Sequence, residues 1–400
     1  MSKLKPTGSS PPASRLPDEM LMEVFLHLPP EPGHLLAASL VCKRWRHLVR
    51  NGAFLGRFRQ LHGTPPLLGF FDNLVYSIGH RHPARPHSPR FTATVAAPAR
   101  VRFTVPERMR IVLDSNRGRL LLYNHDGREL LVWDPMTGAS RSVVTPRAPP
   151  EENAITAALV CTAAAHEEDD AGGEPGPFQI VVVMSCRHLP GHPRTGAWVY
   201  SSEAGAWGDV IPVQAPPPIM ADTNVHAGDC IYWLLNSVGD YDNLILELEL
   251  PQQKTALIET PGDVLENYTM VRLVPSEDGG GIGFAGVDDI DCILHFWSRR
   301  NYGDGMAGWE LMRVVNMRMF ILPGLEAEDL CLCGSIVGFT QDKDVFFLQS
   351  DAGVFMINVR SMQIKKIPDV CGLSMYPFSS FYRRGRDIVG IDDQEPNALT

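Results

Sequence analysis

The stretch LPDEMLMEVFLHLPP, residues 16–30, predicts a helix whose two ends can be identified from its own residues. Pro17 suits a first helical turn, and Asp18 and Glu19 favour the positive N-terminal end of the helix dipole. Pro29 and Pro30 cannot continue a helix, so the segment must stop before them. This short helix is the starting point for the organisation of the whole chain.

Apolar residues occur on two sides of this predicted helix. One stripe has helical spacing and consists of Met20, Leu21, Val24, Phe25 and Leu28, whereas Met22 and Leu26, four apart, form a second stripe. A helix with two apolar sides needs two surfaces to pack against. Either the rest of the chain covers the second stripe, or a separate polypeptide does.

Two more short helices are predicted directly after the first. GHLLAASLV, residues 33–41, places Leu35, Leu36, Leu40 and Val41 at helical spacing, and CKRWRHLVR, residues 42–50, places Trp45, Leu48 and Val49 on one side. Asn51-Gly52 is expected to stop the third helix. A three-helix unit of this size buries around 60% of its unfolded surface or less, so its stability alone is marginal.

Charge divides the chain into two parts. Residues 1–66 hold nine Lys and Arg against four Asp and Glu, and residues 67–400 hold 27 against 42, giving net charges of +5 and −15. Nucleic-acid binding by the basic helices around residues 43–59 is an alternative, but no zinc-finger or recognition-helix pattern accompanies them. The interpretation favoured here is a solvated helix face, with no nucleic-acid partner.

Composition indicates the compartment. Residues 1–13 are polar and rich in Ser and Pro, so they predict a disordered tail, and no apolar run approaches the roughly 18 residues of a membrane helix. The eight cysteines are scattered, except for Cys331 and Cys333, which favours reduced thiols and a nuclear or cytoplasmic location without a membrane partner.

Residues 16–49 resemble the F-box, through the opening Leu16-Pro17, the Leu-rich first helix and the segment LVCKRW at residues 40–45. The continuation NGAFLGRFRQLHGTPPLLGFF, residues 51–71, is similar to plant F-box proteins with an F-box-associated C-terminal domain. The resemblance implies an F-box domain over residues 14–62 that docks on a Skp adaptor and through it on a cullin. The residues that would contact the adaptor are Leu16, Pro17, Leu21, Val24, Phe25, Leu28, Pro29, Leu36, Leu40, Val41, Cys42 and Trp45, some of them also serving the core.

Residues 67–400 predict an almost purely β domain. Short β-branched and aromatic runs such as ELLVWDP, FQIVVVMSC and DVFFLQS alternate with Gly, Pro, Asp and Asn turns. Five strand-turn-strand units can be aligned at Asp134, Ser201, Glu249, Ser298 and Asn358, with steps of 67, 48, 49 and 60 residues. Steps of this size suit four-stranded blades, and the length then predicts a six-bladed β-propeller, with seven blades as the alternative.

Two features of this propeller follow from its ends and loops. Only five units are visible, so a sixth blade must combine strands from PLLGFFDNLVY, residues 66–76, with the C-terminal YPFSSFYRRG, residues 376–385. Residues 79–90 and 166–178 are rich in charge, Gly and Pro, which predicts flexible loops between strands.

Motifs for catalysis are weak. Gly281, Gly283 and Gly286 have dinucleotide-site spacing, but a turn and a strand follow instead of a helix, which favours a β-hairpin. Cys186, His188 and His192, like His80, His82 and His87, lack a second pair at zinc spacing, and Asp288 to Asp291 read as a hairpin turn. We therefore expect no metal, cofactor or catalytic residue.

Together with the β domain, the resemblance to F-box proteins implies a non-catalytic substrate receptor of an SCF-type ubiquitin ligase. The helical domain would bind the adaptor, and loops on one propeller face would bind an unknown protein substrate. The alternatives are an enzyme housed in the propeller and an F-box scaffold that acts outside ubiquitination.

Overall fold

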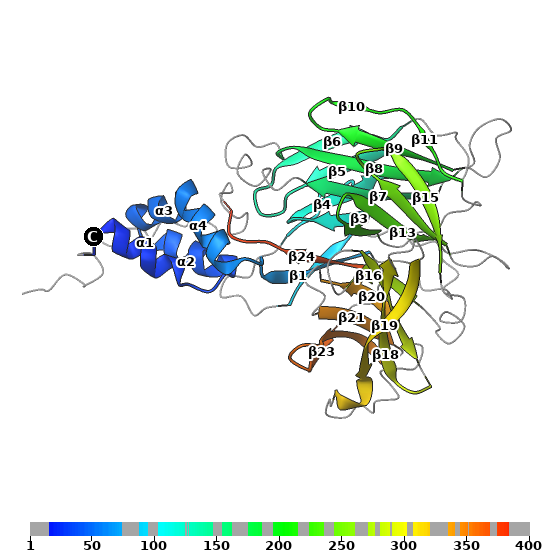
Figure 1. Cartoon of the computed structure of the whole chain (residues 1–400). Helices are drawn as coiled ribbons and strands as arrows, with labels where there is room; N and C mark the ends of the chain where they lie inside the picture. Colours follow the sequence, from blue (N-terminus) through cyan, green and yellow to red (C-terminus); the bar gives the residue numbers. More distant parts are fainter. Residues whose placement is uncertain are drawn as a thin grey trace, which may run out of the picture.

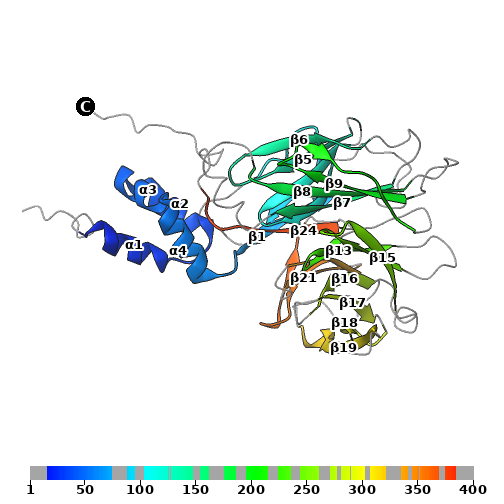
Figure 2. The same ribbon diagram turned by 45° about the horizontal axis from the view of Figure 1, so that its top comes forward.

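The computed structural model describes residues 16–73, 88–94, 103–124, 126, 128–146, 154–161, 175–185, 195–214, 224–235, 244–260, 271–276, 281–288, 290–301, 307–320, 335–340, 345–350, 352–368 and 374–383. The predicted tail, residues 1–13, and most of the predicted loops 79–90 and 166–178 lie outside these ranges. A helical domain stands to one side of a ring of sheets (Figures 1 and 2).

The helical domain contains four helices, one more than the sequence predicted. They are α1 (Asp18–Leu26), α2 (Pro32–Val41), α3 (Lys43–Val49) and α4 (Gly52–His62). The third helix ends before Asn51-Gly52, as predicted, but the same residues also start α4, because the Asn51 side chain accepts a hydrogen bond from Phe54 N at 3.1 Å. Asn caps helix N-termini as well as it ends helices, and Gly63, with a positive φ of 68°, ends α4.

The β domain is a six-bladed propeller, as predicted. Blade 1 consists of β3 (Ile111–Asn116), β4 (Arg119–Asn124), β5 (Glu129–Trp133) and β6 (Ser140–Val144). Blade 2 consists of β7 (Ala154–Cys161), β8 (Phe178–Ser185), β9 (Thr195–Ser201), β10 (Ala206–Trp207) and β11 (Ile211–Pro212). Blade 3 consists of β12 (Asn224–Ala227), β13 (Cys230–Leu235), β14 (Leu244–Glu249) and β15 (Lys254–Glu259). Blade 4 consists of β16 (Val271–Pro275), β17 (Ile282–Asp288), β18 (Ile293–Asn301) and β19 (Ala307–Asn316). Blade 5 consists of β20 (Ser335–Phe339), β21 (Val345–Ser350), β22 (Gly353–Asn358) and β23 (Gln363–Ile367), and the 3-10 helix η2 (Met317–Met319) follows blade 4.

The sixth blade closes the ring with strands from both ends of the domain. It consists of β2 (Arg90–Ala93), β1 (Leu67–Asn73) and β24 (Ser374–Ser379), in that order across the sheet. β1 pairs antiparallel with β24, with Phe71 opposite Tyr376, and the two strands run together between the helices and the other blades in Figure 1. The predicted closure is confirmed, because one sheet contains strands from both ends of the domain.

The five predicted strand-turn-strand units are the two outer strands of blades 1 to 5. The turn after β5 is fixed by Asp134, whose Oδ1 accepts from Met136 N at 2.8 Å and Thr137 N at 3.3 Å. Asn358 Oδ1 makes the same pair of bonds to Arg360 N and Ser361 N after β22. Ser298 is the exception, because it lies inside β18 rather than at its end.

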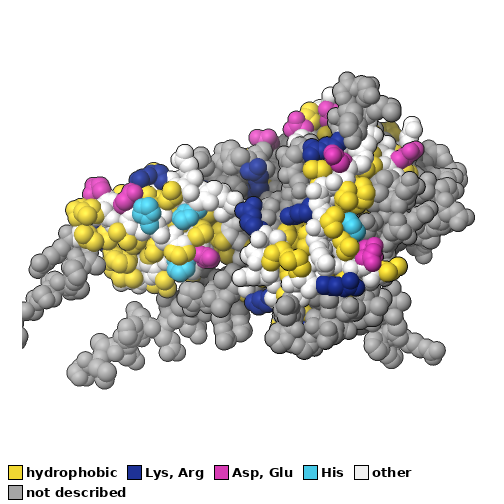
Figure 3. Space-filling view, turned by 60° about the horizontal axis from the view of Figure 1, so that its bottom comes forward, with side chains coloured by type: hydrophobic (Ala, Val, Ile, Leu, Met, Phe, Trp, Pro, Cys, Tyr) yellow, Lys and Arg dark blue, Asp and Glu magenta, His cyan; other side chains and the backbone are white. Residues whose placement is uncertain are grey.

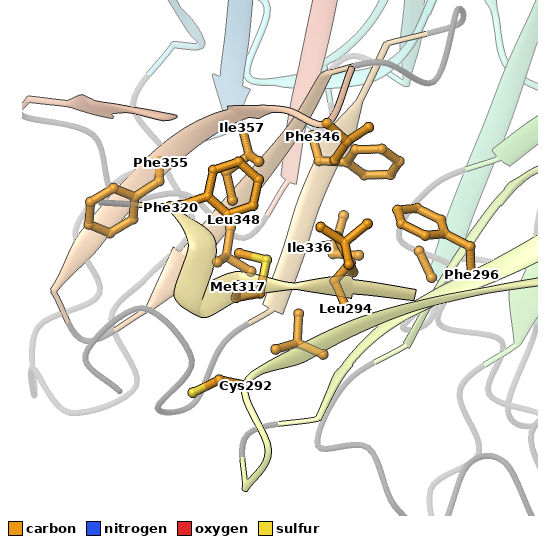
Figure 4. Packing of buried hydrophobic residues seen from close by; sticks show 14 of the residues in the cluster. Cys292, Leu294, Phe296, Met317, Phe320, Ile336, Phe346, Leu348, Phe355 and Ile357 are labelled. Carbon is orange, nitrogen blue, oxygen red and sulfur yellow. The ribbon is translucent and has the colours of Figure 1, made fainter. Parts of the chain in front are cut away.

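Neighbouring blades pack face to face through apolar side chains. Figure 4 shows the cluster between blades 4 and 5, where Leu294 and Phe296 of β18 lie toward Ile336 of β20 and Phe346 of β21. The rings of Phe296 and Phe346 are 4.9 Å apart. The core is therefore a series of interfaces between blades.

Residues 380–383, which follow β24 and are called the clasp below, join the two domains. Tyr382 is buried in the apolar cluster of the helical domain, and the ring of Phe381 lies 6.3 Å from that of Phe58. Arg383 turns back to the propeller, where its Nη1 bonds to Asp134 Oδ2 at 2.7 Å, and both side chains are buried. The four residues of the clasp therefore contact both domains.

Within the described residues, no helix is long and apolar enough to cross a membrane.

We expect Arg383→Met to lower the free energy of unfolding by about 3–5 kcal/mol, because it leaves the Asp134 carboxylate buried without its charge partner. Asp134→Asn in the same chain should restore part of this loss, and Arg108→Met, at an exposed site, should change stability by less than about 0.5 kcal/mol. Urea denaturation of the four proteins measures these differences. Equal stabilities of Arg383→Met and the wild type would contradict a stabilising clasp.

A second prediction concerns pH. Burial raises the pKa of Asp72 above its ordinary value of 3.8, although Arg90 opposes the shift. The folded protein therefore holds this proton more tightly than the unfolded chain, and stability falls as pH rises from 3.8 through the raised value. Asp72→Asn should remove this loss and stabilise the protein at pH 7, whereas Asp209→Asn, at an exposed carboxylate, should not. Thermal melts of the variants between pH 3 and pH 7 test the sign, and a wild type that gains stability over this range relative to Asp72→Asn would refute it.

Candidate protein-interaction site

The twelve predicted adaptor-contact residues fall into three groups by exposure. The exposed group is Pro17, Val24, Pro29, Leu40, Val41 and Cys42, and the half-buried group is Leu16, Leu28, Leu36 and Trp45. Leu21 and Phe25 are each only 2% exposed and belong to the core of the helical domain. Leu21 and Phe25 are therefore among the predicted residues that serve the core of the helical domain rather than its surface.

The two stripes of α1 also have different roles from those expected. Leu26, in the second stripe that either the chain itself or a partner was expected to cover, is 3% exposed, and Met22 packs partly against the same core. Met20 and Val24, assigned to the opposite stripe, are each 55% exposed. The side of α1 that faces the core is therefore turned toward Met22 and Leu26, and Met20 and Val24 are left in solvent.

An exposed apolar face remains on the helical domain, and its most exposed members come from α1 and α2. Met20, Val24, Leu40 and Val41 are between 53% and 62% exposed. Hydrophobic side chains gather on the part of the helical domain that points away from the propeller in Figure 3. We call these four residues the apolar face. Four large apolar side chains more than half exposed on so small a domain are typical of a protein-interaction surface.

Contacts between α1 and the start of α3 fix the shape of the apolar face. Arg44 donates from Nε to Asp18 Oδ1 at 2.7 Å and from Nη2 to the Leu16 carbonyl oxygen at 2.5 Å. Trp45 packs edge-on against Phe25 with ring centroids 5.0 Å apart. These contacts bring the C-terminal end of α2, with Leu40 and Val41, toward the start of α1.

The opposite side of the helical domain is closed by the chain itself. Phe58 of α4 contacts Phe381, and Tyr382 of the clasp is 4% exposed within the same cluster as Leu21 and Phe58. Sequence analysis missed this role, because Phe381 and Tyr382 were read only as part of the last strand. The propeller thus covers one side of the helices and leaves the apolar face uncovered.

The basic residues of α3 and α4 are partly used within the domain. Arg44 and Arg57 form ion pairs with Asp18 at 2.7 Å and with Glu23 at 3.2 Å, and Arg46 donates to the Ser39 carbonyl oxygen. These pairs lie at the surface, where each contributes little to stability. They reduce the number of cations that would be available to phosphate groups.

Candidate catalytic or metal-binding groups do not assemble in the described parts of the chain. No group of three His, Cys, Asp or Glu residues there could hold a metal ion. The His and Cys sets at residues 80–87 and 186–192, and Cys331 and Cys333, lie outside those parts. Gly283 and Gly286 lie within β17, which continues through a turn into β18, so the hairpin interpretation is confirmed.

The four described cysteines, at positions 42, 161, 230 and 292, form no disulfide with one another. Burial raises the pKa of the Cys161 thiol to about 11, with Arg119 opposing the shift. A thiol with this pKa is almost fully protonated at neutral pH, so Cys161 is a poor nucleophile.

An F-box-like helical domain followed by a propeller defines the class of this chain, and family comparison identifies both parts. Residues 13–58 match the family described as F-box-like. Residues 111–380, which are 270 of the 400 residues, match the family described as F-box protein AT5G49610-like, beta-propeller. The chain belongs to this F-box propeller family. F-box domains generally bind Skp adaptors in SCF complexes, and members of such families are typically non-catalytic.

Other comparisons add little about function. No curated protein matches the chain significantly. Hydrazine synthase of Kuenenia stuttgartiensis is 9% identical, with a TM-score of 0.39 over 71% of this chain and 80% of that one. A complex of KlAtg21 with the coiled-coil of AgAtg16 is 10% identical, with a TM-score of 0.35 over 67% and 73%. A luciferin-regenerating enzyme is 11% identical, with a TM-score of 0.35 over 64% and 77%.

The placement of Leu21 leads to a stability prediction. Leu21→Asp should unfold the helical domain, because an unpaired carboxylate would enter a core position that is 2% exposed. Circular dichroism should show lost helix signal, and limited proteolysis should cleave within residues 16–62 while the propeller resists. Val24→Asp is the matched control on the same helix and should keep native helicity. A fully helical Leu21→Asp protein would show that Leu21 is not a core residue.

Proposed function

We propose that this chain is the substrate-recognition subunit of an SCF-type ubiquitin ligase. The helical domain would dock on a Skp adaptor, and through it on a cullin, while the propeller would hold a target protein. The observation that carries this proposal is the apolar face, which the propeller and the clasp leave uncovered.

The energetics of the apolar face favour a stable contact. Full burial of a Val, Leu or Met side chain contributes roughly 1.5–3 kcal/mol, and the apolar face supplies four such side chains that are already more than half exposed. Association costs reduce the net gain, but they do not remove it when the surface is preorganised. The packing of Trp45 against Phe25 provides that preorganisation.

The clasp supports the receptor role in a second way. Because Tyr382 packs among the helices and Arg383 pairs with Asp134 of blade 1, the propeller is held at a defined position relative to the apolar face. A receptor needs such a fixed geometry to present its target to a ligase. We further propose that the protein acts in the nucleus or cytoplasm, is of plant origin and catalyses no reaction itself.

Val24→Asp tests the adaptor contact. A charge placed in the centre of a desolvated interface should weaken adaptor binding by about 2 kcal/mol or more, which is about a 30-fold loss of affinity. Val144→Asp is the matched control, because Val144 is 70% exposed on the outer strand of blade 1. Titration calorimetry with purified Skp adaptor gives the affinities. Equal affinities of Val24→Asp and the wild type would contradict adaptor docking through the apolar face.

A further inference from the structure

The centre of the propeller holds a cavity of about 480 Å³. Its lining includes residues from the innermost strand of every blade, among them Asn116, Cys161, His226, Arg272, Phe339 and Tyr376. The cavity is therefore part of the central channel of the ring. Its volume lies in the range of sites that hold a small molecule or a short piece of chain.

The cavity opens beside the clasp. Arg117, in the turn between β3 and β4, lines the cavity, and its carbonyl oxygen accepts a hydrogen bond from Arg383 Nη2 at 2.9 Å. Arg383 directly follows the residues that pack into the helical domain. A ligand bound in the cavity at Arg117 therefore lies close to the junction with the F-box.

Among the described residues that line the cavity, Asp114 is the one acidic residue, and its carboxylate is already bonded within the wall. Asp114 Oδ2 accepts from Leu159 N at 2.7 Å and lies 3.2 Å from His226 Nε2, and Asp114 Oδ1 accepts from Ser115 N at 2.7 Å. This carboxylate joins the innermost strands of blades 1, 2 and 3. Both carboxylate oxygens of Asp114 therefore already have hydrogen-bond partners within the protein.

Positive charge dominates the rest of the lining. Arg272 lines the wall from blade 4 and donates from Nη1 to the Ile336 carbonyl oxygen at 2.9 Å. Arg117 is exposed, and across the part of the chain that the structure describes no carboxylate pairs with its guanidinium. Two arginines against one engaged aspartate make this a cationic site in a chain with a net charge of −10. Such a site favours an anionic ligand.

Two of the residues that line the cavity, Asn116 and Asn224, have side-chain amide oxygens that can accept further hydrogen bonds. Within the described chain, the buried oxygen Oδ1 of Asn116 and that of Asn224 have no hydrogen-bond partner, and the Asn116 side chain belongs to a residue only 7% exposed. A buried acceptor without a donor is costly, so a ligand that brings N–H groups to these oxygens is favoured over one that has none. A simple anion would bring negative charge but no donor.

An acidic peptide segment supplies both requirements, through side-chain carboxylates and backbone N–H groups. We infer that the channel mouth at Arg117 binds an acidic segment of a partner protein, with carboxylates near Arg117 and Arg272 and backbone N–H groups toward Asn116 and Asn224. Val225, Phe339 and Tyr376 provide an apolar wall for the aliphatic parts of the segment. This inference rests on the proposed function, since it gives the receptor's target its chemical class.

The test uses the full-length protein and a fluorescein-labelled hexapeptide of alternating glutamate and alanine, followed by fluorescence anisotropy. The acidic peptide should bind, and the same peptide with glutamine in place of glutamate should bind at least about tenfold more weakly. Arg117→Met should reduce affinity about tenfold, and Arg117→Glu further. Arg108→Met and Arg108→Glu are the matched controls, because Arg108 is exposed and precedes β3, at the opposite end of that strand from Arg117. Both Arg108 variants should bind the acidic peptide with the affinity of the wild type.

Three results would overturn the inference. These are equal affinity for the glutamate and glutamine peptides, equal affinity of Arg117→Glu and the wild type, and displacement of the peptide by N-acetylglutamate at the same concentration. The last result would assign the site to free small acids. Adaptor binding is measured separately with Val24→Asp, so equal adaptor affinities of Val24→Asp and the wild type, together with retained peptide binding, would reject the proposed function alone.

Discussion

The arrangement of this molecule depends on the clasp, in which a buried ion pair and a buried aromatic side chain lie on adjacent residues. Tyr382 completes the core of the helical domain, and Arg383 is bonded to Asp134 at 2.7 Å inside the propeller. A four-helix unit of fewer than 50 residues has a thin core, so a large side chain donated by another part of the chain has a disproportionate effect on its stability. The Arg383–Asp134 ion pair then fixes the position of Tyr382 relative to the propeller. Motion of the helices relative to the propeller would have to break one contact or the other.

The propeller could be predicted from the sequence to the level of its blade number and its closure. Several outer hairpins repeat a simple local rule, in which a short polar side chain such as Asp134 or Asn358 accepts hydrogen bonds from the backbone N–H groups of the second and third residues after it. Turns of this kind depend only on residues that are close in the sequence, so they form in the structure as the sequence predicts. Where the marker was chosen without such a turn, at Ser298, it fell inside a strand. The closure of the ring could be predicted by counting blades. Five blades were visible in the sequence, so the strands left over at the two ends of the domain had to form the sixth blade together.

The orientation of α1 could not be predicted in the same way. Leu21 and Phe25 are buried as expected, but the buried arc is rotated by about 100°, or one residue on the helical wheel, relative to the predicted arc. Apolar residues lie nearly all round this helix, so its own pattern does not decide which side faces inward. That decision is made by non-local partners, including Leu35 of α2 and Phe54 of α4, together with Tyr382 from the far end of the chain. Sequence analysis also overlooked α4, because Asn-Gly has the same composition as a helix stop.

The closure of the ring and the position of the F-box have a common physical origin. β24 is both the innermost strand of the sixth blade and the strand that leads into the clasp, and Ser115 Oγ of β3 donates to the Pro377 carbonyl oxygen at 2.8 Å. The ring cannot open between blades 6 and 1 without disturbing the residues that anchor the helices. The turn that follows β3 carries both the carbonyl oxygen that receives Arg383 and a wall of the central cavity. The turn at Arg117 and Gly118 therefore joins the wall of the cavity to the junction with the F-box by direct contact.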